Sequence, residues 1–229
     1  LKKYYPTVED ELSFKQSGKN IKFHRYESFE LSNNITLRKF YFLNGFLKGV
    51  RAISFPGSGY IDFHKDNLFV LSTKGILGYS KSIDENMLFE QIPNNLNDYF
   101  SLSQFKKNSQ TDFQLSFRDL TIHNNTIYIS FNEEIENNCW NTSVLVSEVN
   151  YKKLNFKKLF SSNKCVHTID NIDKEFTGSQ GGGRIVVLDD NHILLSVGEY
   201  RSRFLAQETD SVNGKILKIN INDSSYKIV

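Results

Sequence analysis

The sequence predicts an all-β protein built from the antiparallel four-stranded sheets of a β-propeller. A hairpin pattern recurs three times, at residues 67–72, 125–130 and 191–196. Each copy has a turn Asn, a run rich in β-forming residues and a Ser at the same offset, and the copies start 58 and 66 residues apart. Propeller blades usually repeat every ~40–50 residues, so the longer period indicates blades with inserted loops. The alternative is a single β-sandwich whose hairpins are alike by coincidence.

The chain divides into an N-terminal lead-in at residues 1–48 and a partial propeller at residues 49–229. Within the lead-in, residues 21–31 and 37–43 have the imperfect alternation of edge strands. We expect one of them to complete a blade by pairing with a C-terminal part of the full-length chain. The blades are expected at about 49–80, 113–165 and 176–229, with a long polar insertion at 80–112 that carries a short helical turn near residues 83–87.

Composition argues against two function classes. The net charge is +2, from 28 basic and 26 acidic residues that are scattered without blocks, whereas a nucleic-acid surface clusters its Lys and Arg on one face. No run of about 18 apolar residues is present to span a membrane as a helix. Aromatic residues make up 14% of the chain, and strand propensity explains them better than stacking platforms for sugars.

Three blades do not close a propeller. Closed propellers need ~4–8 blades, because each blade is covered only by its neighbours. The 229 residues also begin at Leu1 and end just after a strand-like run. We therefore expect this chain to be a fragment or one piece of a longer chain, with the remaining blades missing from it.

The most specific motif lies near the C-terminal end. Gly181-Gly182-Gly183-Arg184 opens an Ile-Val-Val-Leu run, and a polar turn and a second apolar run follow, ending at Gly198-Glu199. Ala206-Gln207 and a strand that opens on Gly214-Lys215 come next. This order resembles the third blade of soluble quinoprotein glucose dehydrogenases and aldose sugar dehydrogenases, the glucose/sorbosone dehydrogenase-like β-propellers. Segments 117–160 and 59–77 are similar to the second and first blades of that family.

The resemblance carries several implications. It implies about three of an expected six blades, pyrroloquinoline quinone (PQQ) and calcium as cofactors, a small-molecule sugar as substrate, and a periplasmic or extracellular location. The family's calcium contacts come mostly from later blades, so we assign no metal-binding residue. On the matching positions, the resemblance implies that the cofactor is contacted by Gln180, Arg184, Glu199, Arg203 and Gln207.

One position departs from the family pattern. The resembling enzymes have a His four residues before the Arg of this strand, and that His removes the proton of the anomeric hydroxyl. Here the position is Gln180, whose carboxamide donates and accepts hydrogen bonds but does not take up a proton near neutral pH. His167 is the nearest preceding histidine. No catalytic residue is therefore assigned, and the substitution argues against dehydrogenase activity.

Other site chemistries find little support. The glycine run does not read as a phosphate loop, because a strand-like segment follows it where a helix would be needed. The five histidines never fall at metal-ligand spacing, and no Cys-x-x-Cys is present. Two function classes stay open: a PQQ-dependent sugar dehydrogenase relative, and a non-catalytic propeller that binds a glycan or a protein. A propeller unrelated to the family is a third reading.

The only two cysteines are predicted to form a disulfide. Residues 142–150 and 153–160 form a hairpin pattern that turns at Lys152, and pairing about Lys152 sets Cys139 opposite Cys165. Such a register brings the Cα atoms within the ~4–7 Å that a disulfide tolerates. The bridge would agree with an oxidising compartment. Two unrelated thiols are the alternative, if the hairpin splays after Phe160.

Overall fold

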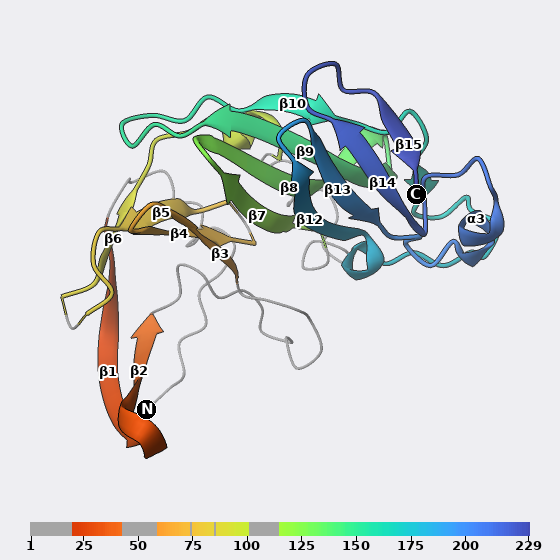
Figure 1. Ribbon diagram of the computed structural model, residues 1–229. Helices are drawn as coiled ribbons and strands as arrows, with labels where there is room; N and C mark the ends of the chain where they lie inside the picture. The colour runs from red at the N-terminus through yellow and green to blue at the C-terminus, as the bar shows by residue number, and fades with distance from the viewer. Residues whose placement is uncertain (1–19, 43–58, 74, 85, 101–114) are drawn as a thin grey trace.

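The computed structural model describes residues 20–42, 59–73, 75–84, 86–100 and 115–229. These residues form three separate antiparallel sheets and one short helix (Figure 1). The hairpins expected at 59–78, 117–160 and 184–220 fall in three different sheets. The all-β, multi-sheet architecture predicted from the hairpin repeat is therefore confirmed.

The first sheet has the strand order β2-β1-β6-β5-β4-β3. It includes β6, which lies inside the insertion expected at 80–112. Phe89 is only 2% exposed there and anchors this short strand. In the sequence, the polar residues around Phe89 give no sign of this burial. Where a short helical turn is expected, the Met87 amide donates to the Asp84 carbonyl at 3.0 Å, three residues back along the chain. The strands are β1 Ile21–Leu31, β2 Ile35–Phe42, β3 Gly59–His64, β4 Asn67–Ser72, β5 Leu77–Ser80 and β6 Leu88–Gln91.

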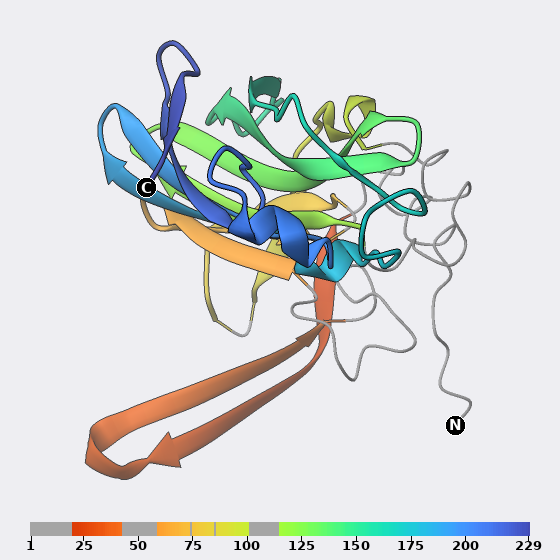
Figure 2. The same ribbon diagram turned by 90° about the vertical axis from the view of Figure 1, so that its right-hand side faces the viewer.

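The two expected edge strands of the lead-in form a hairpin, β1–β2, that projects away from the sheets (Figure 2). Its turn is the 3₁₀ segment η1, Ser32–Asn34. Only the base of β1 joins the first sheet, through the pairs Ile21 with Phe89 and Lys22 with Leu88. In the described chain the lead-in thus extends the first blade, whereas we expected pairing with a C-terminal part.

The second and third sheets are meanders of consecutive strands. The second has the order β10-β9-β8-β7, with β11 also paired to β9, and the third has the order β12-β13-β14-β15. The second sheet comprises β7 Phe117–His123, β8 Thr126–Glu136, β9 Cys139–Glu148, β10 Lys157–Phe160 and β11 Val166–His167. The third comprises β12 Gly182–Asp189, β13 His192–Val197, β14 Lys215–Asn220 and β15 Tyr226–Ile228, and the remaining elements are η2 Leu96–Asp98, η3 Gly178–Gln180 and α3 Arg203–Gln207.

The three sheets pack face to face. Strands β3, β7 and β12, the first strand of each hairpin, lie next to one another in that order, as the innermost strands of neighbouring blades do. One buried cluster, which includes Phe69 and Trp140, fills the space between the first and second sheets. Another, which includes Val144 and Leu217, fills the space between the second and third. Each fully buried large apolar side chain contributes about 1.5–3 kcal/mol.

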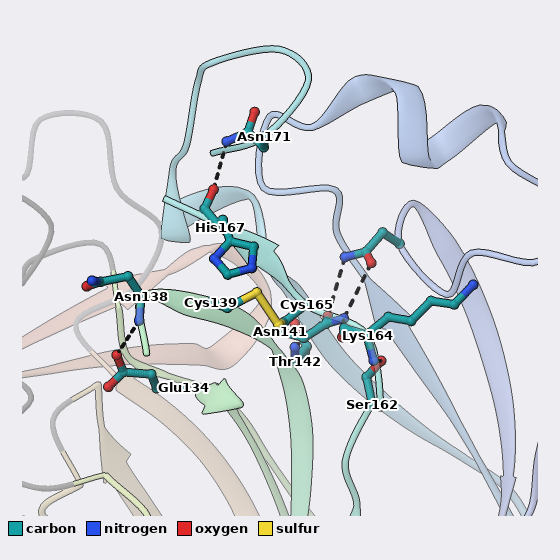
Figure 3. The surroundings of a disulfide bond; sticks show 11 residues. Glu134, Asn138, Cys139, Asn141, Thr142, Ser162, Lys164, Cys165, His167 and Asn171 are labelled. Carbon is teal, nitrogen blue, oxygen red and sulfur yellow. Dashed lines mark hydrogen bonds between the residues drawn. A yellow bond between two sulfur atoms is a disulfide. The ribbon is translucent and has the colours of Figure 1, made fainter. Parts of the chain in front are cut away.

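The predicted disulfide joins Cys139 and Cys165, with Cα atoms 5.3 Å apart (Figure 3). The register that predicted it holds only in part. Strand β10 starts one residue out of the predicted register, with Lys157 opposite Val146, and reaches it only where Phe160 is opposite Val144. Strand β11 then sets His167 opposite Cys139. Cys165 therefore reaches Cys139 diagonally. The bridge spans 26 residues, which corresponds to about 3 kcal/mol of stabilisation in the chain-entropy model.

Candidate functional site

The glycine-rich loop before β12 is tied to the loop after β13. The Gly198 amide donates to the Gly181 carbonyl at 2.8 Å, and the Tyr200 amide donates to the Gln180 carbonyl at 3.4 Å. A Cβ on Gly198 would overlap the Gln180 carbonyl oxygen, so only glycine allows this approach. The backbones at Gln180 and Glu199 are consequently neighbours at one end of the third sheet.

Side chains of the second sheet hold the same loop from its other side. The carbonyls of three successive glycines, 181 to 183, each accept a hydrogen bond from a different strand: Thr142 Oγ1 on β9, Arg118 Nε on β7 and Ser130 Oγ on β8. Arg118 Nη2 also donates to the Ser179 carbonyl at 2.8 Å. The loop is therefore fixed by directional contacts on both sides.

Two of these glycines are required by the close contact. A Cβ on Gly181 would lie 2.5 Å from Asn132 Nδ2 and 2.7 Å from the Tyr200 hydroxyl. Gly183 has φ +110°, and a Cβ there would overlap the Arg118 side chain. The run leads directly into β12, so its amides do not open a helix as those of a phosphate loop do. Its glycines serve packing against the second sheet.

Arg184 forms an ion pair with a buried carboxylate that the sequence did not single out. Its Nη1 lies 2.9 Å from Asp119 Oδ1, and the Ile185 amide donates to Asp119 Oδ2 at 2.7 Å. Asp119 is 1% exposed. Burial raises its pKa above the ordinary value, against the opposing effects of the Ile185 amide and the Arg184 charge. The Arg184 side chain is 71% exposed, so much of the guanidinium still faces solvent.

The buried hydroxyl of Tyr200 holds the loop after β13 against the second sheet. The Tyr200 hydroxyl receives a hydrogen bond from Asn132 at 2.9 Å and lies 2.7 Å from Thr142 Oγ1. Burial raises the pKa of Tyr200 to about 12. Tyr200 and Arg201 have φ of 55° and 70°, and such left-handed residues cost of order 1–3 kcal/mol each. The buried Tyr200 ring, which stacks on Phe176, holds this conformation in place.

The five residues predicted to bind a cofactor occupy two parts of this region. Gln180, Arg184 and Glu199 lie on the joined loops or at the start of β12. The Gln180 side chain is exposed, and Glu199 Oε2 is buried without a hydrogen-bond partner among the described residues. Arg203 and Gln207 are exposed on α3. Arg203 pairs with Glu175, in the segment that leads into η3, at 3.0 Å.

Two further observations limit the chemistry. Within the described ranges, no three His, Cys, Asp or Glu side chains come together as a metal site would require. His167 is exposed on β11, opposite Cys139. No helix in the described part of the chain is long and apolar enough to cross a membrane.

Sequence reasoning missed Arg118, Asp119, Asn132, Thr142 and Tyr200. Only one signal pointed toward them, the charged Arg118-Asp119 pair inside an otherwise apolar strand pattern. Charged residues at such positions are almost never buried unless paired. The pattern does not name the partner, because Arg184 lies 65 residues away on another sheet.

Comparison with known proteins agrees with this geometry. Residues 115–227 match the family described as Glucose / Sorbosone dehydrogenase. No curated protein matches significantly.

Several solved structures share the fold at low sequence identity. A glucose dehydrogenase is 18% identical, with a TM-score of 0.52, over 73% of this chain and 48% of its own. The soluble aldose sugar dehydrogenase of Escherichia coli, in the apo-form, is 17% identical, with a TM-score of 0.51, over 72% and 44%. The PQQ-bound aldose sugar dehydrogenase of Streptomyces coelicolor is 12% identical, with a TM-score of 0.52, over 90% and 50%.

The stacked antiparallel sheets have the β-propeller fold that these solved structures share. The family model matches residues 115–227, and the resemblance found in the sequence is confirmed. The chain spans about half the length of the solved structures it matches.

Proposed function

We propose that this chain is part of a PQQ-dependent aldose dehydrogenase-like propeller whose loop end, around Gln180, binds a small sugar without oxidising it. The observation that carries the proposal is the exposed Gln180 at the position where the resembling enzymes have their proton-accepting His. Its loop is held rigidly by Thr142, Arg118 and Ser130. A fixed loop with an exposed carboxamide suits hydrogen bonding to a neutral sugar hydroxyl.

The residues present fit a quinone carboxylate in part. Arg184 offers an exposed guanidinium, and Gln180 offers an exposed carboxamide, which are suitable partners for the carboxylates and carbonyls of PQQ. Bound PQQ would supply the two-electron acceptor for sugar oxidation. Glu199, with its buried and unpartnered Oε2, would accept a hydrogen bond from a ligand hydroxyl. Arg203 and Gln207, which lie on α3, would form the outer side of this binding site.

Proton transfer is the step that this chain does not support. A general base must accept a proton near the working pH from within hydrogen-bond reach. Gln180 holds a hydroxyl in place but leaves its proton there. The Tyr200 hydroxyl is buried, has a pKa of about 12, and is engaged with Asn132 and Thr142. It does not replace the missing base.

Binding and turnover are measured separately to test the proposal. The complete protein that contains this chain is mixed with PQQ and calcium, and aldose oxidation is followed with a redox dye, while sugar binding is followed by calorimetry. We expect saturable aldose binding without dye reduction. The variant Gln180→Ala should weaken binding, and the control Lys153→Ala, at an exposed turn after β9, should change it little. Dye reduction by the unaltered protein, or no aldose binding at all, contradicts the proposal.

A non-catalytic propeller that binds a glycan or a protein partner is the second candidate, and the same Gln180 favours it. It differs from the first in needing no quinone. Sugar binding that is unchanged when PQQ and calcium are left out would select it. The Cys139–Cys165 disulfide supports a periplasmic or extracellular location for either candidate, because disulfides persist in oxidising compartments.

A further inference from the structure

A cavity of about 290 Å³ lies on the third sheet, away from the loops around Gln180. It is at the turn end of the sheet, where β13 begins, whereas Gly198 and Glu199 follow the other end of β13. At ~3.3 Å per residue, the six residues of β13 separate the two places by roughly 17 Å. The residues that line the cavity are His192, Lys218, Asn220, Ser225, Tyr226 and Lys227.

Four of these residues share the sheet face that points away from the second sheet. Their neighbours Ile193, Leu217 and Ile219 are buried in the cluster against the second sheet, and side chains alternate along a strand. The cross-strand pairs agree with this, since His192 is opposite Asn220 and Lys218 is opposite Lys227. The cavity wall is thus built on a regular sheet, with the β14–β15 turn supplying Ser225.

The two lysines place like charges opposite each other on one face of the sheet. Like charges directly opposite each other in a sheet are destabilising. Neither Lys218 nor Lys227 forms an ion pair with any carboxylate in the described part of the chain. Asn220 uses its Oδ1 to accept the Asn222 amide at 2.8 Å, which leaves the side-chain NH₂ group to donate.

The carboxylates around the cavity accept hydrogen bonds from residues of their own turns. Asp189 accepts the Asn191 amide at 2.9 Å and lies 2.8 Å from His192 Nδ1. Asp223 accepts both the amide and the hydroxyl of Ser225. The Asn191 amide and the His192 side chain lower the pKa of Asp189, and Lys218 adds a smaller effect. Lys218 thus acts on Asp189 at a distance and without an ion pair, and the ammonium groups of both lysines keep their donors for a ligand.

We propose that this cavity binds a monosaccharide-sized anion, a sugar that bears a carboxylate or a phosphate, through Lys218 and Lys227. The ammonium groups contact the anionic group, and the Asn220 amide donates to a neighbouring oxygen. The volume is at the small end for ligand pockets. The site is independent of Gln180 and of the proposed dehydrogenase-like function.

The test uses the complete protein that contains this chain, with calorimetry and thermal melts at constant ionic strength. The probes are inorganic phosphate, glucuronate and glucose, with sodium chloride as the salt control. We expect saturable binding of glucuronate, phosphate or both, and the stronger one identifies the anionic group. Glucose and chloride should have no saturable effect. Equal effects of chloride and the two anions would show simple charge screening and overturn the proposal.

Charge-removing variants locate the site. Lys218→Gln and Lys227→Gln should each weaken anion binding about tenfold, as expected for loss of one charge-assisted contact. Lys153→Gln, an exposed lysine of the second sheet's connecting turn, should leave binding unchanged. Without ligand, Lys218→Gln should raise the melting temperature by roughly 1–4 °C, because the like-charge pair is relieved. Unchanged anion affinity in both cavity variants refutes the proposal, and a lower melting temperature refutes the unpaired charges on which it rests.

Discussion

Two junctions join the three sheets, one between the first and second sheets and one between the second and third. Both contain the same kind of hydrogen bond, but the side chains around it differ. In each, an Asp on one innermost strand accepts the amide of an Ile on the next. Asp62 accepts Ile122 at 2.6 Å, and Asp119 accepts Ile185 at 2.7 Å. Asp62 is half-buried and, among the described residues, also accepts the neighbouring Phe63 amide. Asp119 is fully buried and also binds Arg184.

The surroundings explain this difference. The first junction is filled largely by aromatic rings, such as Phe69 and Tyr79 stacked at 5.8 Å. The second adds a row of hydroxyl and guanidinium donors that clamp the glycine loop. Apolar contact is non-directional, whereas hydrogen bonds fix distance and angle. The first junction therefore joins two blades, and the second also positions a loop.

The largest expected effect is at the clamped loop itself. Gly183→Ala should lower the free energy of unfolding by about 2–5 kcal/mol, because the residue has φ +110° and its Cβ would overlap Arg118. Chemical denaturation measures the change. Val186→Ala, three residues along β12 and 52% exposed, serves as the control and should cost less than about 1 kcal/mol. Equal costs for both variants would show that the loop is not tightly held.

Removing the disulfide should affect the second junction more than the first, because the chain runs from Cys165 toward the glycine loop of the second junction. Replacing both cysteines with Ser should lower the free energy of unfolding by about 3 kcal/mol. Amide hydrogen exchange should accelerate at residues 166–181 and stay unchanged at residues 67–72. Faster exchange in both segments alike would mean that the bridge acts on the whole fold and not on the second junction.

Asp62 and Asp119 hold equivalent positions at the two junctions, so their removal compares the junctions directly. Asp119→Ala should cost about 2–3 kcal/mol, because it leaves a buried amide and a guanidinium without their acceptor. Asp62→Ala should cost about 1 kcal/mol, since water reaches its half-buried site. Denaturation of the two variants under the same conditions gives the difference. A cost for Asp62→Ala as large as that for Asp119→Ala would remove the distinction between the junctions.

A smaller effect concerns pH. Burial raises the pKa of Asp119 above 3.8 in the folded chain, so the folded state holds this proton more tightly than the unfolded state. The corresponding stability is present at low pH and is lost as the pH rises from about 3.8 through the folded pKa. Asp119→Asn should flatten this part of the stability curve. An identical curve for the variant would place the titration on another group.

Local patterns predicted the hairpins and the cysteine pair, because turns and strand alternation depend on neighbouring residues. They did not predict β6, whose anchor Phe89 is hidden among polar residues. Nor did they predict the shift after Lys158, since a change of register leaves no mark in composition. Only part of the candidate site could be predicted from the sequence. Gln180 and Arg184 stood in a motif, but Asp119 and Tyr200 act through contacts between sheets that are distant in sequence.

The central claim, that the loop around Gln180 is a sugar-dehydrogenase site without its proton acceptor, is tested most directly by Gln180→His. The variant and the unaltered complete protein are compared in dye reduction with PQQ, calcium and an aldose. We expect no turnover by the unaltered protein, and turnover by the variant that rises with pH through the ordinary imidazole pKa of about 6.5. Equal turnover by both proteins would contradict it, because the proton would then have another acceptor.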